Sequence, residues 1–293
     1  MTPNVGLIGL CGAEWRKIRG RGLVWAVLIF GGLHGLLAVA LLKGLQILND
    51  KQLPEPVDLY SWLEPVATAL GFAAFPVNGF VLLLLASIVW AEDHSLGTLA
   101  MIFVRPVQRW KVFVSKVLVI VAVTALSLLC AVLVAALLGM VLFGFSGELA
   151  QAPPIPFYSW MGAFEGTGAR LGRIALGVLY AVVVLAPPLC VAAFVANVSR
   201  SPVLTLFGTI IILLVDFFVW AGGSAWAGLK LSGGETAGKV VEWTIWGSRR
   251  FFEAYTLPEA AADASWQPLL ATVGYCGLFL GLGLLLMSRR DIT

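Results

Sequence analysis

The sequence predicts an all-α membrane protein with six transmembrane helices and a short cytoplasmic coupling helix between the second and third. Of its 293 residues, 60% are hydrophobic and 12% are charged, about half the charged fraction of a soluble domain. The apolar residues fall into blocks of about 20 or more, the length that a helix needs to cross a bilayer. This composition excludes an ordinary soluble enzyme, a nucleic-acid-binding protein and a disordered protein.

The six predicted spans contain one acidic residue, Asp216, and one histidine, His34. The third span has 29 residues, so it must tilt or extend beyond the hydrocarbon core. The first span is too long for the apolar region of a cleaved signal peptide. We therefore expect a single transmembrane domain over residues 1–293. Its spans cover residues 23–42, 66–91, 117–145, 174–198, 202–223 and 268–288.

The distribution of basic residues predicts that both termini are cytoplasmic, because Lys and Arg concentrate on the inner side of a membrane. With that orientation, the inner segments hold 11 of the 19 basic residues but only four of the 16 acidic residues. These segments are 1–22, 92–116, 199–201 and 289–293. The first of them is predicted to be an interfacial helix, with Trp15 beside its basic cluster.

Two longer connections are expected on the opposite, outer side of the membrane. Residues 43–65 contain Leu-Pro-Glu-Pro, which predicts an irregular loop. Residues 224–267 combine Gly-rich turns with an aromatic stretch over 239–257, which is predicted to be a helix lying in the interface. We interpret this stretch as a structural lid, and contact with a substrate is the alternative.

No catalytic or cofactor-binding pattern in the chain is convincing. Residues 233–240 match the G-x-x-x-x-G-K part of a phosphate-binding loop, but Val240 replaces the Ser or Thr that holds magnesium. No strand is expected before that segment, so we interpret the match as a coincidence. The four cysteines are too far apart for a metal site, and a lone Asp216 cannot form an aspartyl dyad. We expect that the chain is not an enzyme and binds no cofactor or metal.

The connection 92–116 is the most informative cytoplasmic segment. Leu99, Ile102 and Phe103 recur at helical spacing and predict one or two amphipathic turns. Pro106 then ends that helix, since the residue before a proline disfavours the α conformation. A short helix parallel to the membrane is a docking surface for another protein. A connector whose basic residues only anchor the membrane end is an equal alternative.

The same segment resembles the cytoplasmic signature of type-2 ABC transporter permeases. That signature has an acid, Gly-Thr-Leu, an apolar run, Pro-Val-x-Arg and a Lys seven residues after the Arg. The usual spacing between the acid and the Gly selects Asp93, with Glu92 one position earlier. The segment lies between the second and third spans, as the family requires. Six spans, a basic amphipathic N-terminus and the C-terminal Ser-Arg-Arg-Asp-Ile extend the resemblance over the whole chain. The matching residues are Glu92 or Asp93, Gly97, Thr98, Leu99, Phe103 in the apolar run, Pro106, Arg109 and Lys116.

This resemblance implies a permease subunit that couples ATP hydrolysis to export or translocation of a substrate. Its partners would be a cytoplasmic ABC ATPase subunit, a second permease copy in a homodimer or heterodimer, and the lipid bilayer, but no nucleic acid. ATP and magnesium would bind in the ATPase subunit, which the matching residues of 92–116 would dock. The chain would cross the plasma (inner) membrane several times.

Two other functions stay open at this point: a membrane scaffold or assembly factor that transports nothing, and an ion-driven secondary transporter. Inverted repeats and broken helices would favour the secondary transporter. No internal repeat is convincing, and only residues 76–78 and 187–188 could break helices. Lipid, drug, peptide, glycan and ion substrates all fit the permease hypothesis.

Asp216 is a candidate for a pathway or dimer-interface residue. It lies 14 residues after Pro202, about 21 Å into a hydrocarbon core of about 30 Å. A charge at that depth costs at least ~2.5 kcal/mol, so its side chain is expected to face the bundle or a water-filled cavity. A structural hydrogen bond, or a position at the outer interface of the membrane, is the alternative.

Overall fold

The computed structural model describes residues 6–20, 22–51, 61–73, 76–95, 108–144, 167–199, 201–228, 234–247 and 267–289. Every element in these ranges is an α-helix, as the all-α prediction requires. The helices are α1 (Leu7–Gly20), α2 (Leu23–Asp50), α3 (Leu63–Ala73), α4 (Pro76–Ser95), α6 (Arg109–Phe143), α8 (Thr167–Ser199), α9 (Pro202–Gly228), α10 (Gly234–Glu242) and α13 (Gln267–Arg289).

Five helices in the described part of the chain are long and apolar enough to cross a membrane, namely α2, α6, α8, α9 and α13. The second predicted span, 66–91, corresponds to two described helices: α3 ends at Ala73 and α4 begins at Pro76, with residues 74–75 outside the described part of the chain. Proline favours the first position of a helix and disfavours the α conformation in the residue before it. The described apolar part of α4 is therefore the shorter stretch Val81–Ala91.

The third predicted span also differs from the structure. Helix α6 begins at Arg109, eight residues before the predicted start, and runs as one element to Phe143. Residues 109–116 are therefore the first two turns of α6, and residues 92–95 are the last turn of α4. The connection between the described ends of these helices is correspondingly shorter than the predicted segment 92–116.

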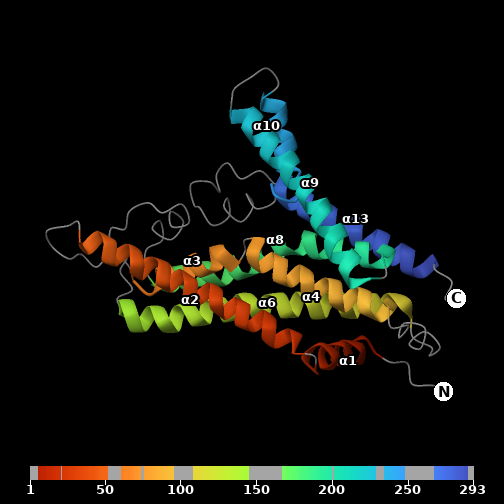
Figure 1. Cartoon of the computed structure of the whole chain (residues 1–293), viewed down its shortest axis with the longest axis horizontal. Coiled ribbons are helices and arrows are strands. Elements are labelled where there is room, and N and C mark those ends of the chain that lie inside the picture. Colours follow the sequence, from red (N-terminus) through yellow and green to blue (C-terminus); the bar gives the residue numbers. More distant parts are fainter. Residues whose placement is uncertain are drawn as a thin grey trace.

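The main bundle is formed by α2, α3, α4, α6 and α8, which contact one another side by side (Figure 1). Helix α8 continues through Pro187 and Pro188 rather than ending there. Figure 1 shows α9 and α10 rising obliquely away from this bundle. Only 11% of the most apolar stretch of α9 is buried, against 61% in α8. The apolar side chains of α9 are therefore available to lipid or to another protein chain.

The closest helix contact in the bundle joins α2 to α6. A Cβ atom at Gly31 would lie 2.4 Å from the Ser127 carbonyl oxygen, and one at Gly35 would lie 2.5 Å from the Ala131 carbonyl oxygen. The two glycines are four residues apart, so they share one face of α2 and face small residues on α6. This is the small-residue packing that brings membrane helices together.

Helix α10 and the turn after it, residues 234–247, form what we call the re-entrant element. As this chain advances from Gly238 to Trp246, its contact on α9 moves back from Ala227 to Leu213. The element therefore runs antiparallel to α9, towards the middle of the predicted span. This corrects the predicted interfacial helix over 239–257: the described helix ends at Glu242, and residues 248–257 lie outside the described part of the chain.

The same helix bears on the phosphate-loop match. Residues 234–239 belong to α10, so they form a helix rather than a loop whose amides surround a phosphate. The helical conformation of these residues and the absence of a Ser or Thr hydroxyl at position 240 both favour a coincidental match.

Candidate functional site

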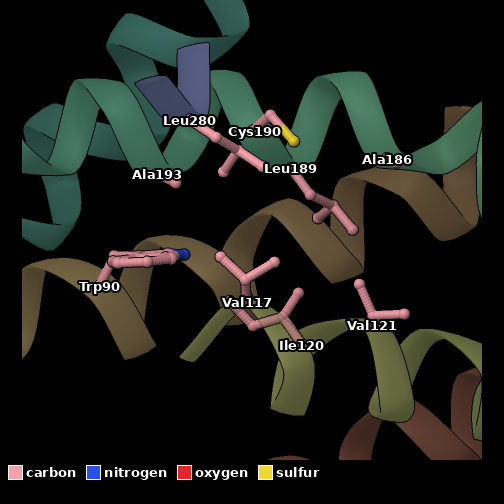
Figure 2. Close-up of a pocket in the computed structure, with 9 residues that line it drawn as sticks. All are labelled: Trp90, Val117, Ile120, Val121, Ala186, Leu189, Cys190, Ala193 and Leu280. Carbon is pink, nitrogen blue, oxygen red and sulfur yellow. The ribbon is translucent and has the colours of Figure 1, made fainter. Parts of the chain in front are cut away.

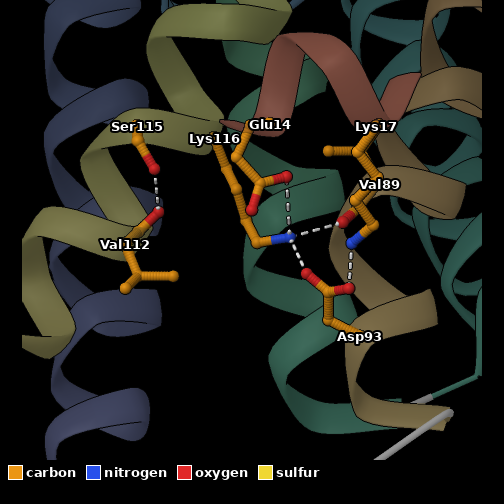
Figure 3. A network of polar contacts seen from close by, with 7 residues as sticks. All are labelled: Glu14, Lys17, Val89, Asp93, Val112, Ser115 and Lys116. Atoms are coloured by element: carbon orange, nitrogen blue, oxygen red, sulfur yellow. Dashed lines mark hydrogen bonds and ion pairs between the residues drawn. The ribbon is translucent and has the colours of Figure 1, made fainter. Parts of the chain in front are cut away.

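A charged network lies at the end of the bundle where α1, α4 and α6 meet (Figure 3). Lys116 on α6 is at its centre: the Nζ atom donates to Asp93 Oδ2 at 2.5 Å and to the Val89 carbonyl oxygen at 2.8 Å. The same Nζ atom lies 3.7 Å from Glu14 Oε2 on α1. Lys17, also on α1, donates to Asp93 Oδ1. The network joins three helices that are far apart in the sequence.

The network is buried although all four of its side chains are ionisable. Asp93 is 0% exposed and Lys116 is 1% exposed, whereas the Lys17 side chain is 27% exposed and reaches water. Two acids face two lysines, and such pairing is the condition under which charges remain buried. Lys116 also lies under Trp90, with Nζ 5.9 Å from the ring centre, and that ring packs on Phe113.

The lysines set the ionisation of Asp93. Burial alone would raise the pKa of this carboxyl, but the charge of Lys116 and the hydrogen bonds from Lys116 and Lys17 lower the pKa from 3.8 to about 2. A carboxyl with a lower pKa in the folded chain than in the unfolded chain stabilises the fold above the unfolded pKa. This contribution is complete at neutral pH and is lost as the pH falls through about 2.

The structure places two signature residues in this network, because Asp93 and Lys116 are in direct contact. Their partners on α1, Glu14 and Lys17, are not among the predicted site residues. The available signal was their spacing of three residues, which puts an acid and a base on one face of the interfacial helix. Glu92 belongs to α4, and its side chain is not described. The predicted short helix lies outside the described residues, together with Gly97, Thr98, Leu99, Phe103 and Pro106.

Arg109 connects the start of α6 to the C-terminal helix. Its Nη1 atom donates to the carbonyl oxygens of Met287 at 3.2 Å and Ser288 at 3.1 Å. These residues are in the last turn of α13, where carbonyl groups have no partner within the helix. The ends of α1, α4, α6 and α13 thus gather at one end of the bundle, as expected if they lie on one side of a membrane.

Arg109→Ala should therefore loosen the end of α13 and reduce the free energy of unfolding by about 1–2 kcal/mol, since both hydrogen bonds come from a partly exposed charged donor. Amide hydrogen exchange of the α13 C-terminal peptide should accelerate. Reversible unfolding in detergent measures the change in the free energy of unfolding. Arg16→Ala is the matched control, because Arg16 donates to Gly12 within its own helix at an exposed position. Equal effects of the two substitutions would contradict the assigned clamp.

Asp216 has a different and more local set of partners. Its two carboxylate oxygens each accept a backbone N–H from the re-entrant element, from Ile245 and from Trp246, both at 3.1 Å. The Trp246 indole Nε1 donates to the Leu213 carbonyl oxygen at 3.0 Å. Asp216 therefore accepts hydrogen bonds from backbone amides of its own chain. Such structural hydrogen bonds are one of the roles predicted for this residue.

A small apolar niche of about 290 Å³, including the space at its mouth, lies between α4, α6, α8 and α13 (Figure 2). Trp90 forms one wall beside the charged network, and Cys190 and Leu280 line the opposite side. Its lining is almost entirely hydrocarbon. The niche therefore offers space to an apolar group but no polar group to select one.

Three comparisons with known proteins complete this description. The family model described as "ABC-2 family transporter protein" matches residues 10–216, which is more than two thirds of the chain. The match begins within α1, includes the whole charged network and ends at Asp216 in α9. No curated protein and no solved structure matches the chain significantly.

Proposed function

Because the chain belongs to the ABC-2 family of transporter membrane proteins, we propose that it is the permease subunit of an ATP-binding cassette transporter. In this proposal a separate cytoplasmic ATPase subunit binds ATP and magnesium, and this chain converts the motion of that subunit into export or translocation of a substrate. A second permease copy completes the pathway. The chain lies in the plasma (inner) membrane with both termini in the cytoplasm.

The observation that carries the proposal is the buried network of Glu14, Lys17, Asp93 and Lys116. Asp93 is in the last turn of α4 and Lys116 is in the second turn of α6, so the network joins the two helices that flank residues 96–107. Its bonds to α1 add the interfacial helix to the same assembly. A displacement of residues 96–107 would therefore move α1, α4 and α6 together.

Arg109 extends this connection to a fourth helix. It lies seven residues before Lys116, hence on the same face of α6, and it holds the last turn of α13. A force applied by an ATPase at residues 96–107 would reach α13 through this contact. In the proposal, Gly97, Thr98, Leu99, Phe103 and Pro106 form the docking surface. Arg109 and Lys116 then transmit the motion rather than bind the ATPase directly.

Single cysteines at positions 96–105 should crosslink to the ATPase subunit in native membranes. Gln52→Cys is the control, because residue 52 is expected on the outer side of the membrane. The complex should also hydrolyse ATP when purified with magnesium, whereas the permease alone should not. If the crosslinks fail and no ATPase copurifies, the scaffold function replaces this proposal.

Phe103→Glu should uncouple the complex: ATP hydrolysis should continue while transport-linked conformational change falls by about tenfold or more, because a charge would disrupt an apolar docking contact. Phe103→Leu keeps an apolar side chain and should leave coupling within about threefold. The two variants should be equally abundant in membranes, measured by quantitative blotting. Normal coupling in Phe103→Glu would contradict the proposed docking role.

A further inference from the structure

The re-entrant element, residues 234–247, returns to the depth of the middle of α9. Its tip, residues 243–247, is level with Leu213 and Asp216, which are 11 and 14 residues after Pro202. At 1.5 Å per residue these positions are about 17–21 Å from the start of the span, in a hydrocarbon core of about 30 Å. The tip is therefore non-helical backbone near the centre of the membrane.

Contacts with two other helices show that the tip packs between candidate spans. Ile245 is 5% exposed and belongs to one cluster with Val191 and Val195 of α8. Tyr275 and Phe279 of α13 pack against this cluster. The four contacting residues of α8 and α13 all lie within candidate membrane spans. The tip thus occupies the seam between α8, α9 and α13.

Non-helical backbone at that depth persists only where its N–H and carbonyl groups are bonded within protein. Asp216 accepts the N–H groups of Ile245 and Trp246, as described above. Thr244 Oγ1 accepts the Gly247 N–H at 2.8 Å and donates to the Val241 carbonyl oxygen at 2.7 Å. The tip is thereby closed on itself and fixed to α9.

The element depends on these bonds because α10 is short. Its nine residues are below the length at which an isolated helix is stable, so tertiary contacts must hold it in place. Gly247 shows how tightly the tip is closed: a Cβ atom there would lie 2.0 Å from the Val241 carbonyl oxygen. The contact with Asp216 fixes two consecutive tip amides to a long helix.

We propose that Asp216 is a positioning residue that latches the tip of the re-entrant element in the seam between α8, α9 and α13, where Ile245 seals that seam against water. The carboxylate acts through the tip and does not itself bind a substrate. This inference rests on the proposed function only in that the sealed seam belongs to a transport pathway. The latch itself is a property of the isolated chain.

The experiment measures amide hydrogen exchange of the 243–247 peptide in the full chain, reconstituted in lipid nanodiscs without an ATPase. Asp216→Ala should accelerate exchange of this peptide by about tenfold or more, because both amides lose their acceptor. Asp216→Asn keeps one acceptor oxygen and should give an intermediate rate. Val215→Ala is the control, since Val215 is 60% exposed on the neighbouring face of α9, and it should leave the rate unchanged.

A tether that replaces the carboxylate separates positioning from any chemical role of Asp216. A Cβ atom at Gly238 would lie 3.8 Å from the Ala227 Cβ atom, a separation suited to a disulfide. In Asp216→Ala, the pair Ala227→Cys and Gly238→Cys should restore protection of the 243–247 peptide when oxidised and lose it when reduced. Peptides of α2 and α6 should exchange equally in all variants.

Two results would overturn the proposal. Unchanged exchange at the tip in Asp216→Ala would show that the carboxylate does not hold it, and failure of the oxidised pair to restore protection would show that Asp216 does more than position the element. Neither result bears on ATPase coupling, because no ATPase is present. Failure of the crosslinking test above would likewise leave the latch intact.

Discussion

Lys116→Met should reduce the free energy of unfolding by about 3–5 kcal/mol, the cost of breaking a buried ion pair by removing one partner. Lys116 is 1% exposed and contacts both Asp93 and Glu14, so its loss removes an opposite charge from two buried acids. Methionine keeps most of the volume of the lysine side chain. The loss of stability therefore comes from the missing charge and hydrogen bonds rather than from a cavity. Reversible unfolding in detergent micelles measures the difference.

Two further variants test this interpretation of the network. Asp93→Leu combined with Lys116→Met should recover part of the lost stability, because replacing both members of a buried pair by apolar residues is often nearly neutral. Lys111→Met is the single-charge control at a partly exposed position and should change stability by less than about 1 kcal/mol. A Lys116→Met variant as stable as Lys111→Met would contradict the assigned role.

Gly35→Val should separate α2 from α6 and destabilise the fold by about 3 kcal/mol or more. Even a Cβ atom at Gly35 would lie 2.5 Å from the Ala131 carbonyl oxygen, so backbone would have to move to accept a side chain. Gly31→Val should have a similar effect, because its Cβ atom would lie 2.4 Å from the Ser127 carbonyl oxygen. Thermal unfolding in detergent, followed by circular dichroism, measures the loss.

Gly44→Val is the matched control for this contact. Gly44 lies on the same helix, and no atom is within 4 Å of the position that its Cβ would take. Its substitution should leave the midpoint of unfolding within about 2 °C of the original. The interpretation of Gly31 and Gly35 as contact residues would be wrong if all three variants unfolded at one temperature.

The apolar blocks were sufficient to predict the all-α class and the positions of most long helices. Helix formation in a lipid-exposed span follows from local composition, since a helix bonds its backbone groups within the segment itself. The division of the second span was only partly visible. Pro76 marked a possible break, but the chain alone does not say whether a proline starts a helix or is absorbed, as Pro187 and Pro188 are in α8.

The resemblance selected Asp93 and Lys116 from the sequence, because both belong to one local segment with fixed spacing. Their partners on α1 could not be predicted from the sequence. Lys17 lies 76 residues before Asp93, and no local pattern specifies a pair at that separation. The tertiary structure determines which charged residues are paired, because a charge that is buried inside the bundle needs an opposite charge beside it.

By itself, the sequence determined that this chain is helical, crosses a membrane and has the signature of its family. Only the tertiary structure decided that the stretch after α9 turns back along that helix. The bonds responsible join Asp216 to amides 29 and 30 residues later. An aromatic, amphipathic stretch has the same local pattern whether it lies in the interface or enters the membrane. What differs is the acceptor for its backbone N–H groups, and a distant carboxylate supplies that acceptor.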